Sequence, residues 1–148
     1  MGSNRVGELK VPDPQGSYVP ATRIGQMIRT AGMTPRRAGQ LIVTGRVGAE
    51  LDVRQARQAA ALAVCNAIVA ARSLIREGEA LRCAALTVYI ACTDDFAEHS
   101  SVADGASDFI CAHLGTDNLP ARSAVGVYTL PGGSPVEVAL VAEAASTE

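Results

Sequence analysis

Apolar and polar residues follow two different periods along this chain, and the clearest pattern is helical. From Asp52 to Arg76 the apolar residues recur at helical spacing, and neither glycine nor proline interrupts them. Asp52 is a suitable N-cap, since its carboxylate can accept a hydrogen bond from the first helical turn. We therefore expect a long helix that ends before Gly78 and whose many alanines allow close packing against a sheet.

Segments with strand-like patterns precede this helix. Residues 18–32 predict one or two strands with a bend at Gly25, because apolar positions alternate weakly there. Residues 34–40 hold a proline, two arginines and a glycine and predict a loop, and residues 40–48 predict a short strand closed by glycines. The first third of the chain is thus expected to supply several strands.

A strand and a second helix are expected after the long helix. Residues 81–92 are rich in β-branched and other strand-forming residues and predict a strand. The second helix is expected to start near Asp95 or Ser101 and to run to Leu114, where Gly115 stops it. This order of elements predicts an α+β fold with a single mixed β-sheet and two helices packed on one face.

Two valine-rich runs, 121–131 and 136–141, meet at a Pro-Gly-Gly-Ser-Pro turn and predict a C-terminal hairpin. Arg122 starts the first run and Glu137 lies in the second. A hairpin that places both in one pocket would provide a fixed cation for a small carboxylate, with an acid or base beside it. Two plainer interpretations stay open, in which Arg122 pairs with an acidic group at an interface and Glu137 faces solvent on an edge strand.

The second face of the expected sheet also carries few charges. A sheet with helices on one side only should alternate with polar residues on its solvated side. We expect this face to be buried against other copies of the chain, because an exposed apolar sheet face marks an interaction surface. The apolar positions concerned are Val125, Val127, Val136, Val138 and Leu140.

Length and composition limit the function classes. With 148 residues, 48% of them hydrophobic and 19% charged, the chain predicts one domain over 16–148, preceded by an N-terminal arm over 1–15. A net charge of −2 and the absence of tryptophan argue against nucleic-acid binding, which favours a basic surface and exposed rings. No apolar run is long enough to span a membrane, and the N-terminus lacks a signal peptide's apolar core.

The four cysteines, Cys65, Cys83, Cys92 and Cys111, are widely and irregularly spaced in apolar stretches. This pattern favours buried, reduced thiols in a cytoplasmic protein over disulfides. The two histidines have no metal-ligand spacing with cysteine or acidic residues, so we expect no metal site and assign the histidines to the surface or to helix caps.

The chain resembles the RidA/YjgF family, which is also called endoribonuclease L-PSP-like, and a divergent branch of it. The likeness extends from about residue 16 to residue 142 and depends on the order and spacing of several short motifs. These motifs are Gly16-Ser17-Tyr18-Val19-Pro20, Ile28-Arg29-Thr30-Ala31-Gly32, Gly45-Arg46-Val47-Gly48, residues 59–66, Val88-Tyr89, Asp95-Phe96 and Pro120-Ala121-Arg122-Ser123-Ala124-Val125.

The resemblance implies a chorismate-mutase-like fold and a homotrimer. Three sheets would form a central barrel with the helices outside and with ligand clefts between adjacent subunits. Better-known members of the family hydrolyse reactive enamines and imines to 2-keto acids and ammonia, without an organic cofactor or a metal. The resemblance thus predicts a hydrolytic deaminase whose substrate is a small carboxylate with a C=N bond.

The resemblance also implies roles for individual residues. Arg122 would grip the substrate carboxylate, for which a planar bidentate guanidinium is well suited. Glu137 would lie near the attacking water and act as acid or base. Tyr18 would line the cleft, Gly32 would bring the backbone close to the ligand, and the backbone of Ala124 would lie beside Arg122.

Three positions depart from the typical family pattern. Ala124 replaces a cysteine, Asp104 replaces an asparagine early in the second helix, and Gly126 replaces a larger residue. A carboxylate at 104 changes the charge of the cleft and is expected to repel an anionic substrate. Ala124 and Asp104 favour an alternative function, a non-catalytic trimer that binds small carboxylate metabolites. RNA cleavage ranks third, because the chain is acidic and poor in aromatic residues.

Overall fold

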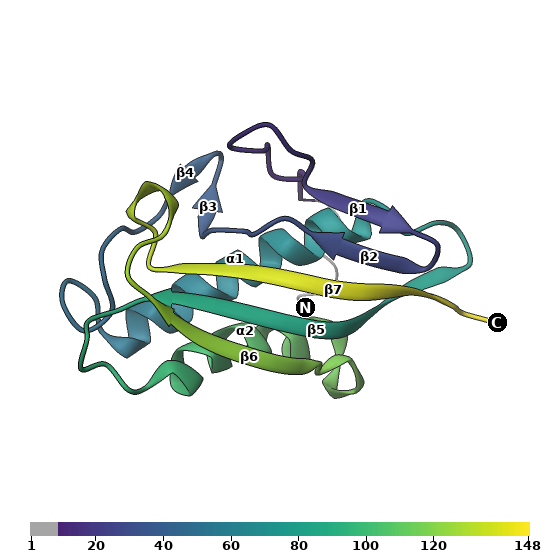
Figure 1. The fold of residues 1–148 in the computed structure, drawn as a ribbon. Helices are drawn as coiled ribbons and strands as arrows, with labels where there is room; N and C mark the ends of the chain where they lie inside the picture. The colour runs from purple at the N-terminus through teal and green to yellow at the C-terminus, as the bar shows by residue number, and fades with distance from the viewer. Residues whose placement is uncertain (1–8) are drawn as a thin grey trace.

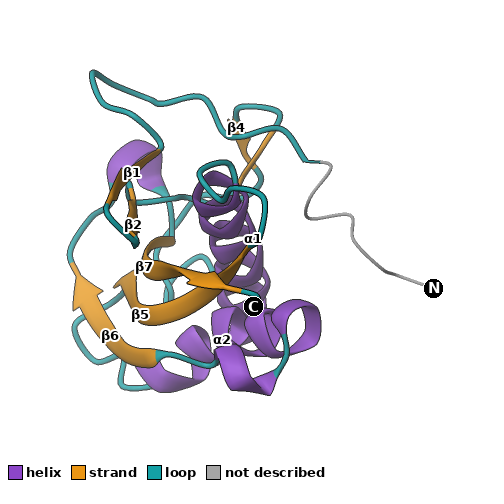
Figure 2. Ribbon diagram, turned by 90° about the vertical axis from the view of Figure 1, so that its right-hand side faces the viewer, coloured by secondary structure: helices purple, strands orange, loops and turns teal. Residues whose placement is uncertain are grey.

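The computed structural model describes residues 9–148, which form a sheet with two helices on one of its faces (Figure 1; Figure 2). The strands are β1 (Ala21–Ile24), β2 (Met27–Thr30), β3 (Arg36–Arg37), β4 (Gln40–Leu41), β5 (Glu79–Ala91), β6 (Ala121–Val127) and β7 (Val136–Ser146). The helices are α1 (Val53–Arg72) and α2 (His99–Leu114), with short 3₁₀ turns at η2 (Thr116–Asn118) and η3 (Pro131–Gly133). The first eight residues, part of the expected arm, lie outside the described range.

The main sheet has five strands in the order β1-β2-β7-β5-β6. Strands β5 and β6 are parallel, and every other neighbouring pair is antiparallel. Both helices lie on the same side of this sheet, as the view in Figure 2 shows. The expected α+β fold, with one mixed sheet and helices on one face, is therefore confirmed.

The expected hairpin of the last two strands is wrong. Strand β5 lies between β6 and β7 and hydrogen-bonds to both, so β6 and β7 are not neighbours. The chain passes from β5 through α2 into β6, and a parallel pair requires a long crossover of this kind. Residues 128–135 then cross the end of β5 to reach β7. Alternation in the sequence identified both strands, but it carries no information about which strand lies between them.

Helix α1 begins as expected and ends earlier than expected. A capping box closes its N-terminus: the Asp52 carboxylate accepts from the Gln55 backbone N–H at 2.8 Å, and the Gln55 side chain accepts from the Asp52 N–H at 3.0 Å. The helix ends at Arg72 rather than Arg76. Ser73 donates to the Ala70 carbonyl at 2.6 Å, and the chain must turn there to enter β5.

The bend at Gly25 and the reduced cysteines agree with expectation, whereas the strand expected over residues 40–48 is much shorter. Gly25 has a φ of 63° in the tight turn between β1 and β2, which confirms two strands and the bend. Within 40–48 only Gln40 and Leu41 pair as a strand, because the backbone that follows bonds to scattered partners in loops. Cysteines 65, 83 and 92 are buried and Cys111 is half-buried, and none of the four forms a disulfide.

Alternate residues of β7 face opposite sides of the sheet. Val136, Val138 and Leu140 are fully buried beneath the helices, whereas Glu137 and Val141 lie on the open face. Three of the five apolar positions assigned to the second face by sequence therefore belong to the helix-covered core. Val125 is 39% exposed on the open face, which still presents apolar groups.

Among the residues that the structure describes, no helix is long and apolar enough to cross a membrane.

Candidate functional site

Arg122 lies on the edge strand β6 and points toward α2. Its Nη1 donates to Asp104 Oδ1 at 2.7 Å and to the Ser107 hydroxyl at 2.9 Å. Its Nη2 donates to the Ser100 hydroxyl at 2.9 Å and, more weakly, to the Ser100 carbonyl at 3.4 Å. Since the two terminal nitrogens carry four N–H bonds, α2 engages all of them. Arg122 is therefore an ion-paired, 20% exposed side chain in this conformation.

Ser100, Asp104 and Ser107 reach Arg122 because they share one face of α2. Their spacing of four and then three residues places them on the same side of a helix. Asp104 was expected in the ligand cleft from the family pattern, although not as the partner of Arg122, and the two serines were missed. The helical spacing of polar residues from position 100 onward was the signal that could have found them.

Glu137 lies on the opposite face of the sheet. It is paired in register with Tyr89 of β5 and is half-buried. Burial raises the pKa of the Glu137 carboxyl above its ordinary value of 4.5. An ideal Cβ added to Gly32 would lie 2.5 Å from Glu137 Oε2. The absence of a side chain at Gly32 thus leaves the space that the carboxylate occupies.

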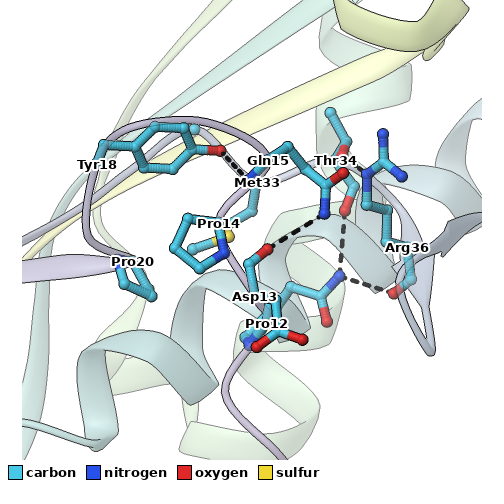
Figure 3. A pocket seen from close by; sticks show the side chains of 11 residues that line it. Pro12, Asp13, Pro14, Gln15, Tyr18, Pro20, Met33, Thr34 and Arg36 are labelled. Atoms are coloured by element: carbon cyan, nitrogen blue, oxygen red, sulfur yellow. Dashed lines mark hydrogen bonds between the residues drawn. The ribbon is translucent and has the colours of Figure 1, made fainter.

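Tyr18 and Gly32 line a small cavity (Figure 3), and Glu137 lies against Gly32 but is not itself a lining residue. The cavity has a volume of about 30 Å³, and residues 12–15 of the expected N-terminal arm form much of its wall. The Tyr18 hydroxyl accepts a hydrogen bond from the Gln15 backbone N–H at 3.0 Å, which fixes the ring against this segment. The other lining residues are Pro20, Met33, Thr34, Arg36 and Asn66.

The expectation that Arg122 and Glu137 share one pocket is wrong for a single chain. Arg122 is aligned with Leu86 on the helix-covered face, and Glu137 is aligned with Tyr89 on the open face. With β5 between them, they are separated by two strand spacings, about 10 Å, and by three residues along the strands, about 10 Å more. The sheet itself also separates their side chains.

The predicted site residues therefore fall into two half-sites. The acid half-site consists of Glu137, Gly32 and Tyr18, and the arginine half-site consists of Arg122 and Asp104 with Ser100 and Ser107.

Ala124 lies two residues beyond Arg122 on the same face of β6. Its side chain is half-buried and packs against the hydrophobic core.

No group of three or more His, Cys, Asp or Glu side chains within residues 9–148 is arranged to hold a metal ion. Neither half-site offers the cluster of ligands that a protein-bound cation requires. The chemistry available to these residues is that of a carboxyl group, a tyrosine hydroxyl and an ion-paired guanidinium.

The fold defines the class of protein, an α+β domain in which two helices cover one face of a mixed sheet. Its candidate glutamate, tyrosine and arginine lie in two separate half-sites. The chain belongs to the Endoribonuclease L-PSP family, the RidA/YjgF family that its motifs resemble: a sequence model of the family matches residues 8–144.

Individual relatives agree with this assignment. Protein TCP17 of Trypanosoma cruzi is 31% identical over 132 residues, which cover 88% of this chain and 82% of that protein. The crystal structure of Atu1372 from Agrobacterium tumefaciens, a protein of unknown function, is 33% identical, with a TM-score of 0.77 and coverage of 87% and 83% of the two chains. E. coli TdcF with bound serine is 28% identical, with a TM-score of 0.62 and coverage of 90% and 92%.

Proposed function

We propose that this protein hydrolyses the C=N bond of a reactive imine or enamine of a small carboxylate, releasing a 2-keto acid and ammonia. The observation that carries the proposal is the Glu137 carboxyl. It is half-buried with a raised pKa, and it lies against the backbone of Gly32, which lines a cavity together with Tyr18. A carboxyl group whose pKa is raised toward neutrality is suited to both accepting and donating a proton.

The proposed reaction needs two proton transfers from oxygen to nitrogen, both through Glu137. Glu137, as carboxylate, accepts a proton from a water molecule whose oxygen adds to the imine carbon, and returns that proton to the nitrogen, which gives a carbinolamine. The carboxylate then accepts the carbinolamine hydroxyl proton and passes it to the nitrogen, so that the C=O bond forms, the C–N bond breaks and ammonia leaves. The Tyr18 hydroxyl, at the wall of the cavity, orients the ligand.

The two half-sites favour a cleft completed by two copies of the chain. Arg122 lies on β6, at the edge of the sheet, and Glu137 lies on the open face. A head-to-tail contact in which one copy's β6 edge meets the next copy's open face would bring Arg122 and Glu137 together. Repeated around a threefold axis, such a heterologous contact closes into a trimer.

Asp104 shapes what this cleft accepts. Its carboxylate already balances the charge of Arg122, so a substrate carboxylate must displace it or share the guanidinium with it. This ion pair favours the second candidate function, a trimer that binds small amino or keto acids without converting them. The relative TdcF, solved with bound serine, supports a small zwitterionic ligand for that alternative.

Ammonia and keto-acid release from freshly generated 2-iminopropionate and 2-iminobutyrate tests the proposal. Wild type should accelerate release, Glu137→Gln should lose that acceleration by a factor of about 100 or more, and Arg122→Ala should lose it with the oligomer intact. Binding of 2-keto acids without acceleration would establish the second function. Full activity in both variants would exclude the site, and cleavage of RNA by the purified protein would replace the proposal.

A further inference from the structure

A thiol and an imidazole meet in a groove that the proposed deaminase does not use. Cys92, just after β5, and His99, the first residue of α2, contact each other with 3.6 Å between Sγ and Nε2. This distance allows the thiol S–H to donate to the ring nitrogen. Both residues line an open groove of about 330 Å³ at the end of β5 and β6.

Gly126 makes this contact possible. An ideal Cβ at Gly126 would lie 2.5 Å from His99 Nε2 and 3.1 Å from Cys92 Sγ. Any larger residue there would have to displace the ring or the thiol. The absence of a side chain at Gly126 therefore creates the space in which the two groups pair.

A cation lies in the wall of the same groove. The Arg46 guanidinium donates from Nη2 to the Cys92 carbonyl and stacks on the Tyr128 ring, with 4.7 Å from Cζ to the ring centroid. Its Nε is buried and has no hydrogen-bond partner among residues 9–148. No carboxylate in the described part of the chain forms an ion pair with it. Its positive charge thus remains available to stabilise negative charge that develops on a ligand in the groove.

The protonation state of the Cys92 thiol determines whether the His99 imidazole must act as a base. Burial raises the pKa of Cys92, and the charge of Arg46 only partly offsets this. The thiol is therefore protonated at rest, and a base must remove its proton for it to react. His99 is the group in position, while Asp94 and Tyr128 are the other titratable side chains lining the groove.

We propose that Cys92 and His99 form a second reactive site, in which the thiol adds to small α,β-unsaturated carbonyl compounds. Sγ forms a bond to the β-carbon while its proton passes to His99 Nε2. The C=C electrons move onto the enolate, whose oxygen Arg46 stabilises. The α-carbon then takes up the proton from the imidazolium, so the adduct contains every atom of the electrophile and no oxidant is required.

Acrylamide, a small neutral compound of this class, is the probe. The native protein is labelled for timed intervals, unfolded, alkylated at its remaining thiols with an isotopically heavy reagent, and mapped by peptide mass spectrometry. Cys92 is 8% exposed and Cys111 is more exposed, so simple accessibility would make Cys111 the faster residue. The proposal requires the reverse order, with Cys92 faster by a factor of about 10 or more.

Three variants distinguish activation of Cys92 by His99 from simple solvent exposure of the thiol. His99→Gln and Gly126→Ala should each slow labelling of Cys92 to the rate of Cys111 or below, while labelling of Cys111 stays unchanged and confirms the fold. Glu137→Gln, which removes the proposed deaminase acid, should leave the Cys92 rate unaltered, so that the two proposals fail independently. Faster labelling of Cys111 in wild type, or a Cys92 rate that His99→Gln does not change, would overturn the inference.

Discussion

At Gly32 the lack of a side chain decides where the acid of the site can lie. The Glu137 carboxyl occupies the space that a Cβ would need, and no positive φ constrains the glycine there. A substitution would therefore be tolerated by the backbone and would act mainly on the far end of the glutamate side chain.

Gly32→Ala should displace the Glu137 carboxylate with little cost in stability. We expect imine hydrolysis to fall about tenfold or more, because small misplacement of a catalytic group is costly, with the unfolding midpoint in urea nearly unchanged. Ala31→Gly, on the neighbouring residue, is the control and should retain activity. Wild-type rates in Gly32→Ala would show that the close packing of glycine and carboxylate has no catalytic consequence.

Glu137→Gln should stabilise the protein at neutral pH while it abolishes activity. The folded-state pKa of Glu137 is raised, so folding favours the neutral carboxyl. The stability that the neutral form contributes is fully present below pH 4.5 and is lost as the pH rises through the folded-state pKa. Glutamine mimics the neutral form. We expect the Tm to rise by about one to three degrees at pH 7, a small change because water screens a half-exposed group. At pH 4 the difference between variant and wild type should vanish.

One ion pair connects strand β1 to strand β5. Arg23 of β1 makes two bonds to the Glu79 carboxylate at the start of β5, at 2.6 and 2.7 Å, and a third to the Leu74 carbonyl after α1, at 3.0 Å. One guanidinium therefore connects an edge strand, a central strand and the end of the long helix. The hydrogen bonds from Arg23, together with one from the Arg76 backbone N–H, lower the pKa of Glu79 from 4.5 to about 2.

Glu79→Gln tests this connection through its pH dependence. The depressed pKa means that Glu79 contributes stability above pH 4.5 and loses it as pH falls toward about 2. Urea unfolding at pH 7, 4, 3 and 2 should therefore show a wild-type advantage that shrinks on acidification through that window. Glu77→Gln, at an exposed position, is the matched control. A gap between Glu79→Gln and wild type that is constant with pH would contradict the assigned role of the ion pair.

At the scale of the whole molecule, the open sheet face and the split site point to the same assembly. Ile24 and Met27 at the β1–β2 turn are 71% and 52% exposed, and Val125 is partly exposed on the same open face. A heterologous contact that covers this face would also join the arginine half-site of one copy to the acid half-site of the next.

Mixed oligomers of two inactive variants test that geometry directly. Arg122→Ala and Glu137→Gln chains, co-expressed in equal amounts, should regain about one quarter of wild-type activity, because one interface in four then joins an intact Arg122 to an intact Glu137. Co-expression of two differently tagged Glu137→Gln chains is the control and should stay inactive. Absence of recovery, with mixed oligomers verified by mass, would exclude a site that joins Arg122 of one copy to Glu137 of the next.

The sequence by itself determined the elements and the family. The unbroken helical period from Asp52, the capping residue and the glycines at turns predicted most element boundaries, because these are local effects of backbone geometry and hydrogen bonding. The early end of α1 at Arg72 escaped prediction, since it depends on a side-chain bond from Ser73 and on the path into β5.

Only the tertiary structure decided which strands are neighbours and on which faces the site residues lie. Sequence placed Arg122 and Glu137 on successive strands. The insertion of β5 separated those strands, and the register aligns the two residues with Leu86 and Tyr89, three residues apart, so that they lie on opposite faces of the sheet. The pairing of Cys92 with His99 likewise required the missing side chain of Gly126. Periodicity indicates on which face of its own helix or strand a residue lies, whereas contacts between distant segments depend on the order in which the elements pack.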